Sequence, residues 1–175
     1  PEMTRSHLPP RHNVLRADIT TLANVYYRLS RHENAIPLLE ECIKAFEATR
    51  GRQHTETLVA IGNLGANYRS LGRVAEAVPF LEEAWRSGKG RAELHFVGSH
   101  LLGAYVAVAG SAKESDVAKA LAMADELLAA NRAVLRNQSP ELAQELNSVA
   151  MRLLDLRAFE KAEPLIREAL EIREK

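Results

Sequence analysis

The chain has 175 residues, 46% hydrophobic and 26% charged, which is long enough for one domain with a sizeable core and too apolar for disorder. Its 23 basic and 23 acidic residues give a formal net charge of +0, so no global field favours nucleic acid or an anionic membrane as a partner. No apolar run approaches the roughly 20 residues of a membrane span. The single cysteine, Cys42, excludes an internal disulfide. Together with the lack of an apolar leader, this favours a cytoplasmic location.

The N-terminal segment, residues 1–15, is polar and contains Pro9-Pro10, which predicts the end of a preceding repeat or a link. Since the sequence does not begin with Met and ends on a charged helical run, we expect a fragment of a longer protein, with one repeat domain over residues 16–175. The first unit, about residues 16–49, has apolar residues at spacings of three and four in two stretches, which predicts two amphipathic helices. These residues are Ile19, Leu22, Ala23, Tyr26 and Leu29, then Ala35, Ile36, Leu39, Cys42, Ile43 and Phe46.

The clearest unit spans residues 57–87. Its first helix is predicted to end at Gly72, as helices often do at a C-terminal glycine, and Pro79 falls early enough in the second helix to be tolerated. Gly65 is small where the two helices of this hairpin should cross, so we expect it to be a packing residue. The unit therefore reads as a helical hairpin.

The third unit, residues 92–135, is irregular, and the fourth, residues 140–174, is again regular. In the third unit the helices are expected over Ala92–Ala109 and Asp116–Leu135, and the turn Gly110–Ser115 is longer than its counterparts. This turn is predicted to be mobile. It is either a contact surface or a neutral insertion of the kind that surface loops tolerate.

An internal repeat relates these units. Six residues return 42 positions later as the same type, which indicates a stack of similar units that bury their apolar faces against one another. The pairs are Leu22 and Leu64, Tyr26 and Tyr68, Leu29 and Leu71, Ala35 and Ala77, Pro37 and Pro79, and Leu39 and Leu81.

The second unit resembles the tetratricopeptide repeat, through Leu64-Gly65, Tyr68, Gly72, Ala77, Leu81 and Ala84 at the spacings of that family. The 42-residue period, with Pro37, Pro79 and Pro164 in matching stretches, is similar to the kinesin-light-chain type of this repeat. The resemblance implies an all-α, right-handed superhelical solenoid of about four hairpins. It also implies a protein–protein interaction module with a scaffolding or regulatory role.

In such arrays the first helix of each hairpin lines a concave face, and we expect an extended peptide or a partner helix to bind there. Asparagine suits this role, because its amide can both donate to and accept from a peptide backbone. The predicted peptide-binding residues are Thr20, Asn24, Tyr27, Arg28, Asn63, Ala66, Arg69, Ser70, His100, Asn147 and Met151, and the wider expected lining adds Gly62, Phe96, Ser99, Gln144, Ser148 and Arg152.

Asn24 and Asn63 match two asparagines that hold a C-terminal carboxylate in carboxylate-clamp members of the family. The clamp also needs lysine or arginine, but the matching positions here are Thr20, Phe96 and His100, so we do not expect a chaperone-tail clamp. The alternative is that both asparagines bond only to neighbouring helices. Likewise, Arg28 and Arg69 could meet acidic residues of a partner; the alternative is that they pair with a neighbouring glutamate or stay solvated.

The sequence contains no catalytic or metal-binding constellation that we recognise, so we expect no enzyme activity, cofactor or metal. The six histidines are scattered without zinc-ligand spacing, and the carboxylates of Glu40 and Glu82 are expected to be solvated on an outer face. The predicted partner is a protein or peptide, without nucleic acid or membrane. The alternative is a structural array that forms homo-oligomers through its exposed terminal helices.

Overall fold

The computed structural model describes residues 11–110 and 113–174, and over these residues the chain forms eight α-helices, one short 3-10 turn and no strand. The elements are α1 (Arg11–Arg28), α2 (His32–Arg50), α3 (Thr55–Ser70), α4 (Val74–Ser87), η1 (Ala92–Leu94), α5 (His95–Ala109), α6 (Glu114–Val134), α7 (Pro140–Asp155) and α8 (Phe159–Arg173). The predicted all-α solenoid is confirmed. No helix in these ranges is both long and apolar enough to cross a membrane.

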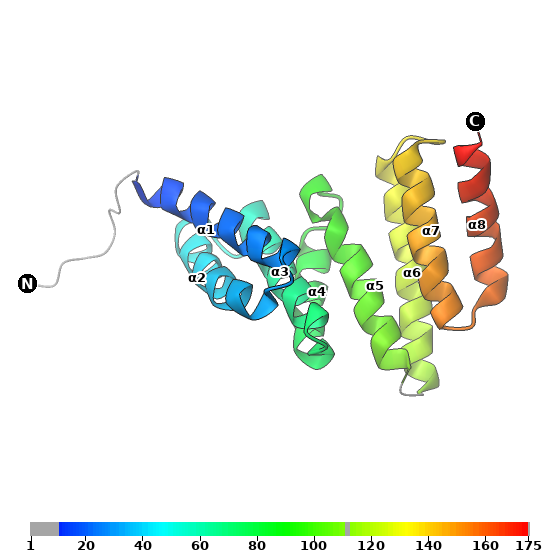
Figure 1. The fold of residues 1–175 in the computed structure, drawn as a ribbon, viewed down its shortest axis with the longest axis horizontal. Helices are drawn as coiled ribbons and strands as arrows, with labels where there is room; N and C mark the ends of the chain where they lie inside the picture. Colours follow the sequence, from blue (N-terminus) through cyan, green and yellow to red (C-terminus); the bar gives the residue numbers. More distant parts are fainter. Residues whose placement is uncertain (1–10, 111–112, 175) are drawn as a thin grey trace, which may run out of the picture.

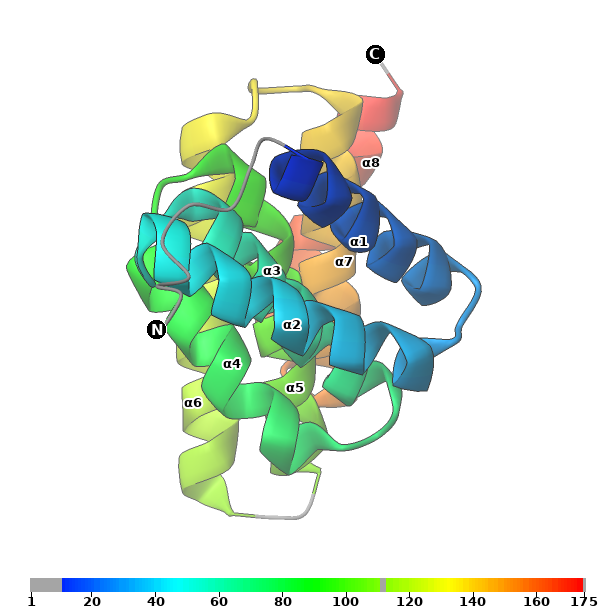
Figure 2. The same cartoon turned by 90° about the vertical axis from the view of Figure 1, so that its left-hand side faces the viewer.

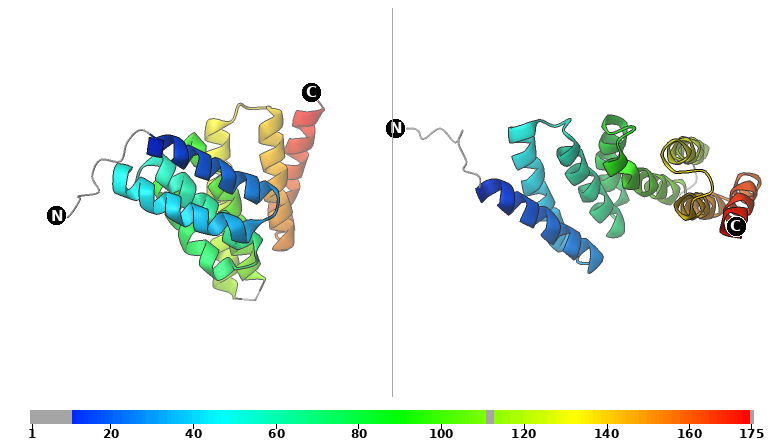
Figure 3. Two further views of the ribbon diagram at one scale, coloured as in Figure 1. Left: turned by 60° about the vertical axis from the view of Figure 1, so that its left-hand side comes forward. Right: turned by 90° about the horizontal axis from the view of Figure 1, so that it is seen from above.

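Successive helices pair into four hairpins, which follow one another along the long axis of the molecule (Figure 1). Each second helix also packs against the first helix of the next hairpin. Seen from the N-terminal end, the α1–α2 pair lies across the hairpins behind it (Figure 2), and from above the hairpins run from one end to the other without folding back (Figure 3). The buried apolar residues of all four hairpins form one continuous core.

Several boundaries differ from the sequence-based expectation. The helix expected over Ala92–Ala109 begins as the 3-10 turn η1 and continues as α5 from His95. Helix α1 begins at Arg11, before the expected start at residue 16, and residues 1–10 of the predicted link lie outside the described residues. Helix α6 begins at Glu114, inside the turn expected over Gly110–Ser115, so that turn is shorter than predicted. Its residues 111 and 112 lie outside the described ranges, and its mobility remains a prediction.

The turns inside the first, second and fourth hairpins share one conformation. Ser30, Gly72 and Arg157 have φ values of 56°, 74° and 58°, and the N–H that follows each one donates to the carbonyl five residues earlier, at 2.8 to 3.0 Å. This is the Schellman ending of a helix, which requires a left-handed residue after the last turn. Only Gly72 adopts that conformation without a steric cost.

Glycines allow the close helix contacts on which the stack depends. A Cβ on Gly65 would lie 2.7 Å from Cγ of Leu81 and 3.2 Å from the carbonyl oxygen of Ala77, so α3 and α4 touch where Gly65 was expected to pack. A Cβ on Gly98 would lie 2.7 Å from Cζ3 of Trp85, which is the corresponding contact between the second and third hairpins. Both positions leave no room for a larger residue.

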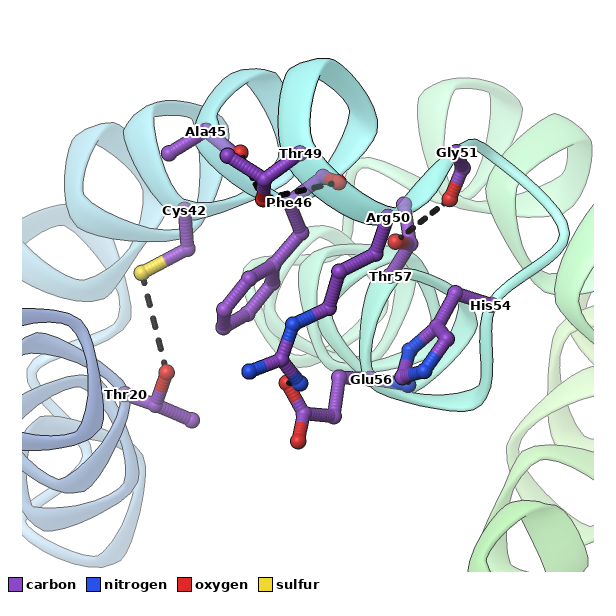
Figure 4. A network of polar contacts seen from close by, with 10 residues as sticks. All are labelled: Thr20, Cys42, Ala45, Phe46, Thr49, Arg50, Gly51, His54, Glu56 and Thr57. Atoms are coloured by element: carbon purple, nitrogen blue, oxygen red, sulfur yellow. Dashed lines mark hydrogen bonds and ion pairs between the residues drawn. The ribbon is translucent and has the colours of Figure 1, made fainter. Parts of the chain in front are cut away.

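Polar residues fix the links between hairpins. Between α2 and α3, the hydroxyl of Thr57 donates to the carbonyl of Gly51 at 2.9 Å, the ring of His54 accepts from the N–H of Glu56, and Arg50 pairs with Glu56 (Figure 4). The ring nitrogen of His54 therefore caps α3, satisfying an N–H that has no partner inside the helix.

A tyrosine and a glutamate connect neighbouring hairpins along the outer edge of the stack. The hydroxyl of Tyr68 lies 3.4 Å from Glu40, and that of Tyr105 lies 2.5 Å from Glu82. The ammonium of Lys119 reaches Glu82 at 2.7 Å and covers the ring of Tyr105 at 4.3 Å. The expectation that these glutamates are merely solvated is therefore wrong for Glu82, which is hydrogen-bonded to a residue of the next hairpin.

Candidate binding groove

The first helices of the hairpins form the inner side of the stack. Helix α3 contacts α5 and α5 contacts α7, whereas the second helices of neighbouring hairpins approach one another less closely. A stack whose first helices are nearer to each other than its second helices must curve toward the first helices. The face formed by α3, α5 and α7 is thus the concave one. Tyr27 of α1 joins it through its ring contact with His100 of α5, and we call this face of α1, α3, α5 and α7 the groove.

Four side chains, one from each first helix, converge in the middle of the groove. We call Tyr27, Arg69, His100 and Arg152 the groove cluster. Nε of Arg69 donates to Nδ1 of His100 at 3.2 Å, and the rings of Tyr27 and His100 meet edge to face with centroids 6.2 Å apart. The sequence placed all four residues on this face, and the structure brings them together.

Gly103 makes the space in which the two arginines meet. A Cβ on Gly103 would lie 3.0 Å from Nη1 of Arg69 and 3.9 Å from Nε of Arg152. Both guanidinium groups therefore lie against the same stretch of α5, although α3 and α7 belong to hairpins on opposite sides of it.

The electrostatics of the groove cluster are those of a partly buried group of cations. Burial lowers the pKa of His100 to about 4, and the charges of Arg69 and Arg152 act in the same direction. Burial also lowers the pKa of Arg69, with the hydroxyl of Tyr27 opposing and the charge of Arg152 adding to this effect. His100 is thus neutral at pH 7, and its Nδ1 is the nitrogen that accepts from Arg69.

Arg69 has no acidic partner among the described residues. Within residues 11–110 and 113–174, no carboxylate lies within ion-pair distance of its guanidinium, and Arg152 reaches only Asp155, at 3.5 Å. The sequence left open whether Arg69 pairs with a glutamate of its own array. The structure excludes that pairing for the described residues, and a partly buried arginine beside a second arginine is electrostatically unfavourable until an anion joins them.

The other predicted groove residues fall into three groups. Asn24, Arg28, Ser70 and Met151 are exposed, and Asn63 and Asn147 are half-buried. Among the described residues, neither the Asn24 nor the Asn63 side-chain amide has a hydrogen-bond partner, so the alternative that they only bond to neighbouring helices finds no contact to support it.

Two predicted residues do not present their side chains to the groove. Ala66 is only 2% exposed and belongs to the buried set. The hydroxyl of Thr20 lies 3.7 Å from Sγ of Cys42 on α2, so it is directed into the first hairpin (Figure 4). Both are corrections to the expected lining, and both arise because a one-residue difference on a helix turns a side chain by about 100°.

Sequence reasoning missed Gly103 and Asn67. Gly103 follows Ala66 by 37 residues, the offset that also separates Tyr68 from Tyr105, so aligning the third unit on its tyrosine would have found it. Asn67 is buried, donates to the carbonyl of Asn63 at 2.8 Å and bonds the ring of His32 at 3.0 Å. It joins the first two hairpins, and no sequence signal separated it from the neighbouring asparagines.

Comparison with known proteins identifies the fold. The tetratricopeptide repeat family matches residues 14–86 and, separately, residues 143–175. The chain is a tetratricopeptide-repeat protein. The array is similar to the nearly identical repeats of a candidate kinesin light chain from Podospora anserina (22% identity, 98% of this chain, 79% of that one, TM-score 0.71) and to BtubC (BKLC) from P. vanneervenii (21% identity, 97% and 66%, TM-score 0.76). The curated proteins contain no match.

Tetratricopeptide repeats generally mediate protein–protein interactions, and their fold is a non-catalytic scaffold family. In the described part of the chain, no three residues among the histidines, cysteine and carboxylates lie close enough together to hold a metal ion.

Proposed function

We propose that this array binds an extended peptide of a partner protein along the groove, as a non-catalytic scaffolding or regulatory module of a cytoplasmic protein. In this proposal the four repeat units are the hairpins α1–α2, α3–α4, α5–α6 and α7–α8. The observation that carries it is that each first helix has a polar side chain that is at least partly exposed and was expected on this face: Asn24 on α1, Asn63 on α3, His100 on α5 and Asn147 on α7. Polar side chains spaced along a stack suit a peptide backbone, which offers donors and acceptors at regular intervals.

The array is not a chaperone-tail clamp in this proposal. Such a clamp would need a cation beside Asn63, and the residue that the third hairpin supplies is His100, whose pKa burial lowers to about 4. A neutral imidazole cannot replace the missing lysine. The peptide is therefore held by Asn24, Asn63 and Asn147 through its backbone, with its side chains setting specificity.

The test is a peptide-display selection on the purified chain, repeated on Asn24→Ala and Asn63→Ala. Enriched peptides should bind the parent and lose roughly fivefold or more in affinity with each variant, as expected for a hydrogen bond worth about 1 kcal/mol. Asn137→Ala, an exposed asparagine in the α6–α7 link, is the matched control and should bind normally. Peptides that bind all three variants alike would count against the groove.

A second candidate function is self-association through the ends of the stack. Leu22 on α1 is 42% exposed, whereas Leu64, its repeat partner, is 2% exposed beneath a neighbouring hairpin. Leu29, in the turn after α1, and Leu170 on α8 are also exposed. Light scattering of the parent chain and of Leu22→Lys tests self-association. A concentration-dependent oligomer that the substitution dissociates would support it, and a monomer at all concentrations would exclude it.

A further inference from the structure

The groove cluster has the composition of an anion-binding site. It holds two guanidinium groups from different hairpins, Arg69 and Arg152, on the one stretch of α5 where Gly103 leaves space. The described residues provide no carboxylate to Arg69, and provide only a surface aspartate to Arg152 at 3.5 Å. Two like charges held this close together are unfavourable unless an opposite charge lies beside them, so the pair points to an anionic ligand.

The surroundings of the pair orient Arg69 toward the groove. His100 accepts from its Nε at 3.2 Å, and His100 is in turn held between the rings of Tyr27 and Phe96, at centroid distances of 6.2 and 6.1 Å. The hydroxyl of Tyr27 also hydrogen-bonds the side chain of Arg69, so two neighbours within the cluster hold this arginine. The terminal N–H groups that these contacts do not use can donate to the oxygens of a carboxylate or a phosphate.

We propose that Arg69 and Arg152 bind an oxyanion of the peptide, either a carboxylate side chain or a phosphate group, over Gly103 in the centre of the groove. The inference rests on the proposed function for the source of the anion, but the site itself needs only the four first helices. It differs from a carboxylate clamp, because the binding groups are the two arginines, with His100 as a neutral positioning residue. The partner it selects is an acidic peptide segment.

Binding of the anion would also offset the repulsion between the guanidinium groups of Arg69 and Arg152. The anion would neutralise the charge that Arg152 imposes on Arg69 and on His100, and it would replace water with two charge-assisted hydrogen bonds in a partly buried place. Since the two arginines come from α3 and α7, the ligand would connect the second hairpin to the fourth across α5.

The experiment is a titration of the purified chain with inorganic phosphate and, separately, with acetate, followed by NMR of the imidazole of His100. We expect a saturable shift with at least one of the two anions and a rise in the pKa of His100 at saturation, because the anion offsets the charges of both arginines. Response to acetate alone indicates a carboxylate site, and response to phosphate alone indicates a phosphate site. No saturable shift with either anion overturns the proposal.

Variants separate this site from general charge effects. Arg69→Gln and Arg152→Gln should each weaken binding of the responding anion about tenfold or more, as expected for a charge-assisted hydrogen bond. Arg136→Gln, which removes an exposed arginine from the α6–α7 link, should leave it unchanged. Gly103→Ala keeps every charge but fills the space beside Nη1 of Arg69, and should weaken binding as well. If Gly103→Ala and both arginine variants bind the anion as tightly as the parent chain does, the proposed site is wrong.

The proposed function and this site can fail separately. If phosphate or acetate binds but display yields no peptide, the anion site stands and peptide binding in the groove does not. If peptides bind through Asn24 and Asn63 but respond neither to Arg69→Gln nor to replacement of their acidic residues by amides, the groove stands and the anion site is wrong.

Discussion

Gly65 tests the close packing of α3 on α4, and Gly65→Leu should destabilise the array. The first added carbon would lie 2.7 Å from Cγ of Leu81 and 3.2 Å from a backbone oxygen of α4, and three more carbons must follow. Overpacking of this kind costs about 1–3 kcal/mol or more, and the better helix propensity of leucine returns about 1 kcal/mol. We expect a net loss of about 2 kcal/mol, or about 4–8 °C in Tm for a chain of this length.

The measurement is thermal and urea unfolding followed by circular dichroism, with Gly65→Ala as an intermediate and Gly103→Ala as the matched control. Gly103 also lies within a first helix, but the atom nearest to its added Cβ is Nη1 of Arg69 at 3.0 Å, the end of a flexible side chain that can move. Its variant should unfold at the parent temperature or gain up to about 1 kcal/mol from helix propensity. If Gly65→Leu melts with or above Gly103→Ala, the packing argument is wrong.

Three further predictions follow from the turns, the groove and the outer edge. Ser30→Gly and Arg157→Gly should each raise the free energy of unfolding in urea by about 1 kcal/mol, because both residues adopt a left-handed backbone conformation. Gly72→Ser should lower it by a similar amount, and equal stabilities of the parent and the variants would show that the turns carry no strain. Burial lowers the pKa of His100 from 6.5 to about 4, so the unfolded chain binds more protons than the folded chain between these pH values. The free energy of unfolding should therefore fall as the pH drops from about 6.5 toward 4, by at most about 3 kcal/mol. His100→Gln should flatten this part of the stability-versus-pH curve, and an identical curve would contradict the burial of His100. Tyr105→Phe should cost about 1 kcal/mol in urea unfolding by removing the hydrogen bond to Glu82, and an unchanged midpoint would show that the inter-hairpin connection does not stabilise the stack.

The regular hairpins were predictable because their information is local and repeated. The apolar spacing of three and four identifies the helices, and the recurrence of Tyr26 as Tyr68 fixes which helices correspond. Gly72 indicates the end of α3, because glycine adopts the left-handed conformation after a helix without a steric cost. Ser30 and Arg157 form the same turn without that signal, so only the period, and not the residue type, reveals it.

The lining of the groove was harder to predict, because it depends on the rotation of each helix. Period alone places Thr20 and Ala66 within one residue of the groove, and the packing of the hairpins then turns Thr20 toward Cys42 and buries Ala66. The contact between Arg69 and His100 joins residues of different units. A repeat pattern specifies each unit and says nothing about how side chains from two units meet.

The irregular third unit is what creates the groove cluster. In α5 the corresponding residues follow those of α3 by 37 positions instead of 42, so His100 stands where α3 has Asn63 and Gly103 stands where it has Ala66. Helix α4 has 14 residues, whereas α2 has 19, and this difference brings α5 forward. Arg91 fixes the link between α4 and α5 by donating to the carbonyl of Gln53 at 2.9 Å. A regular third unit would have placed an asparagine and a methyl group against Arg69. His100 and Gly103 supply instead an acceptor for Nε and room for the guanidinium, so the proposed anion site depends on this departure from the repeat.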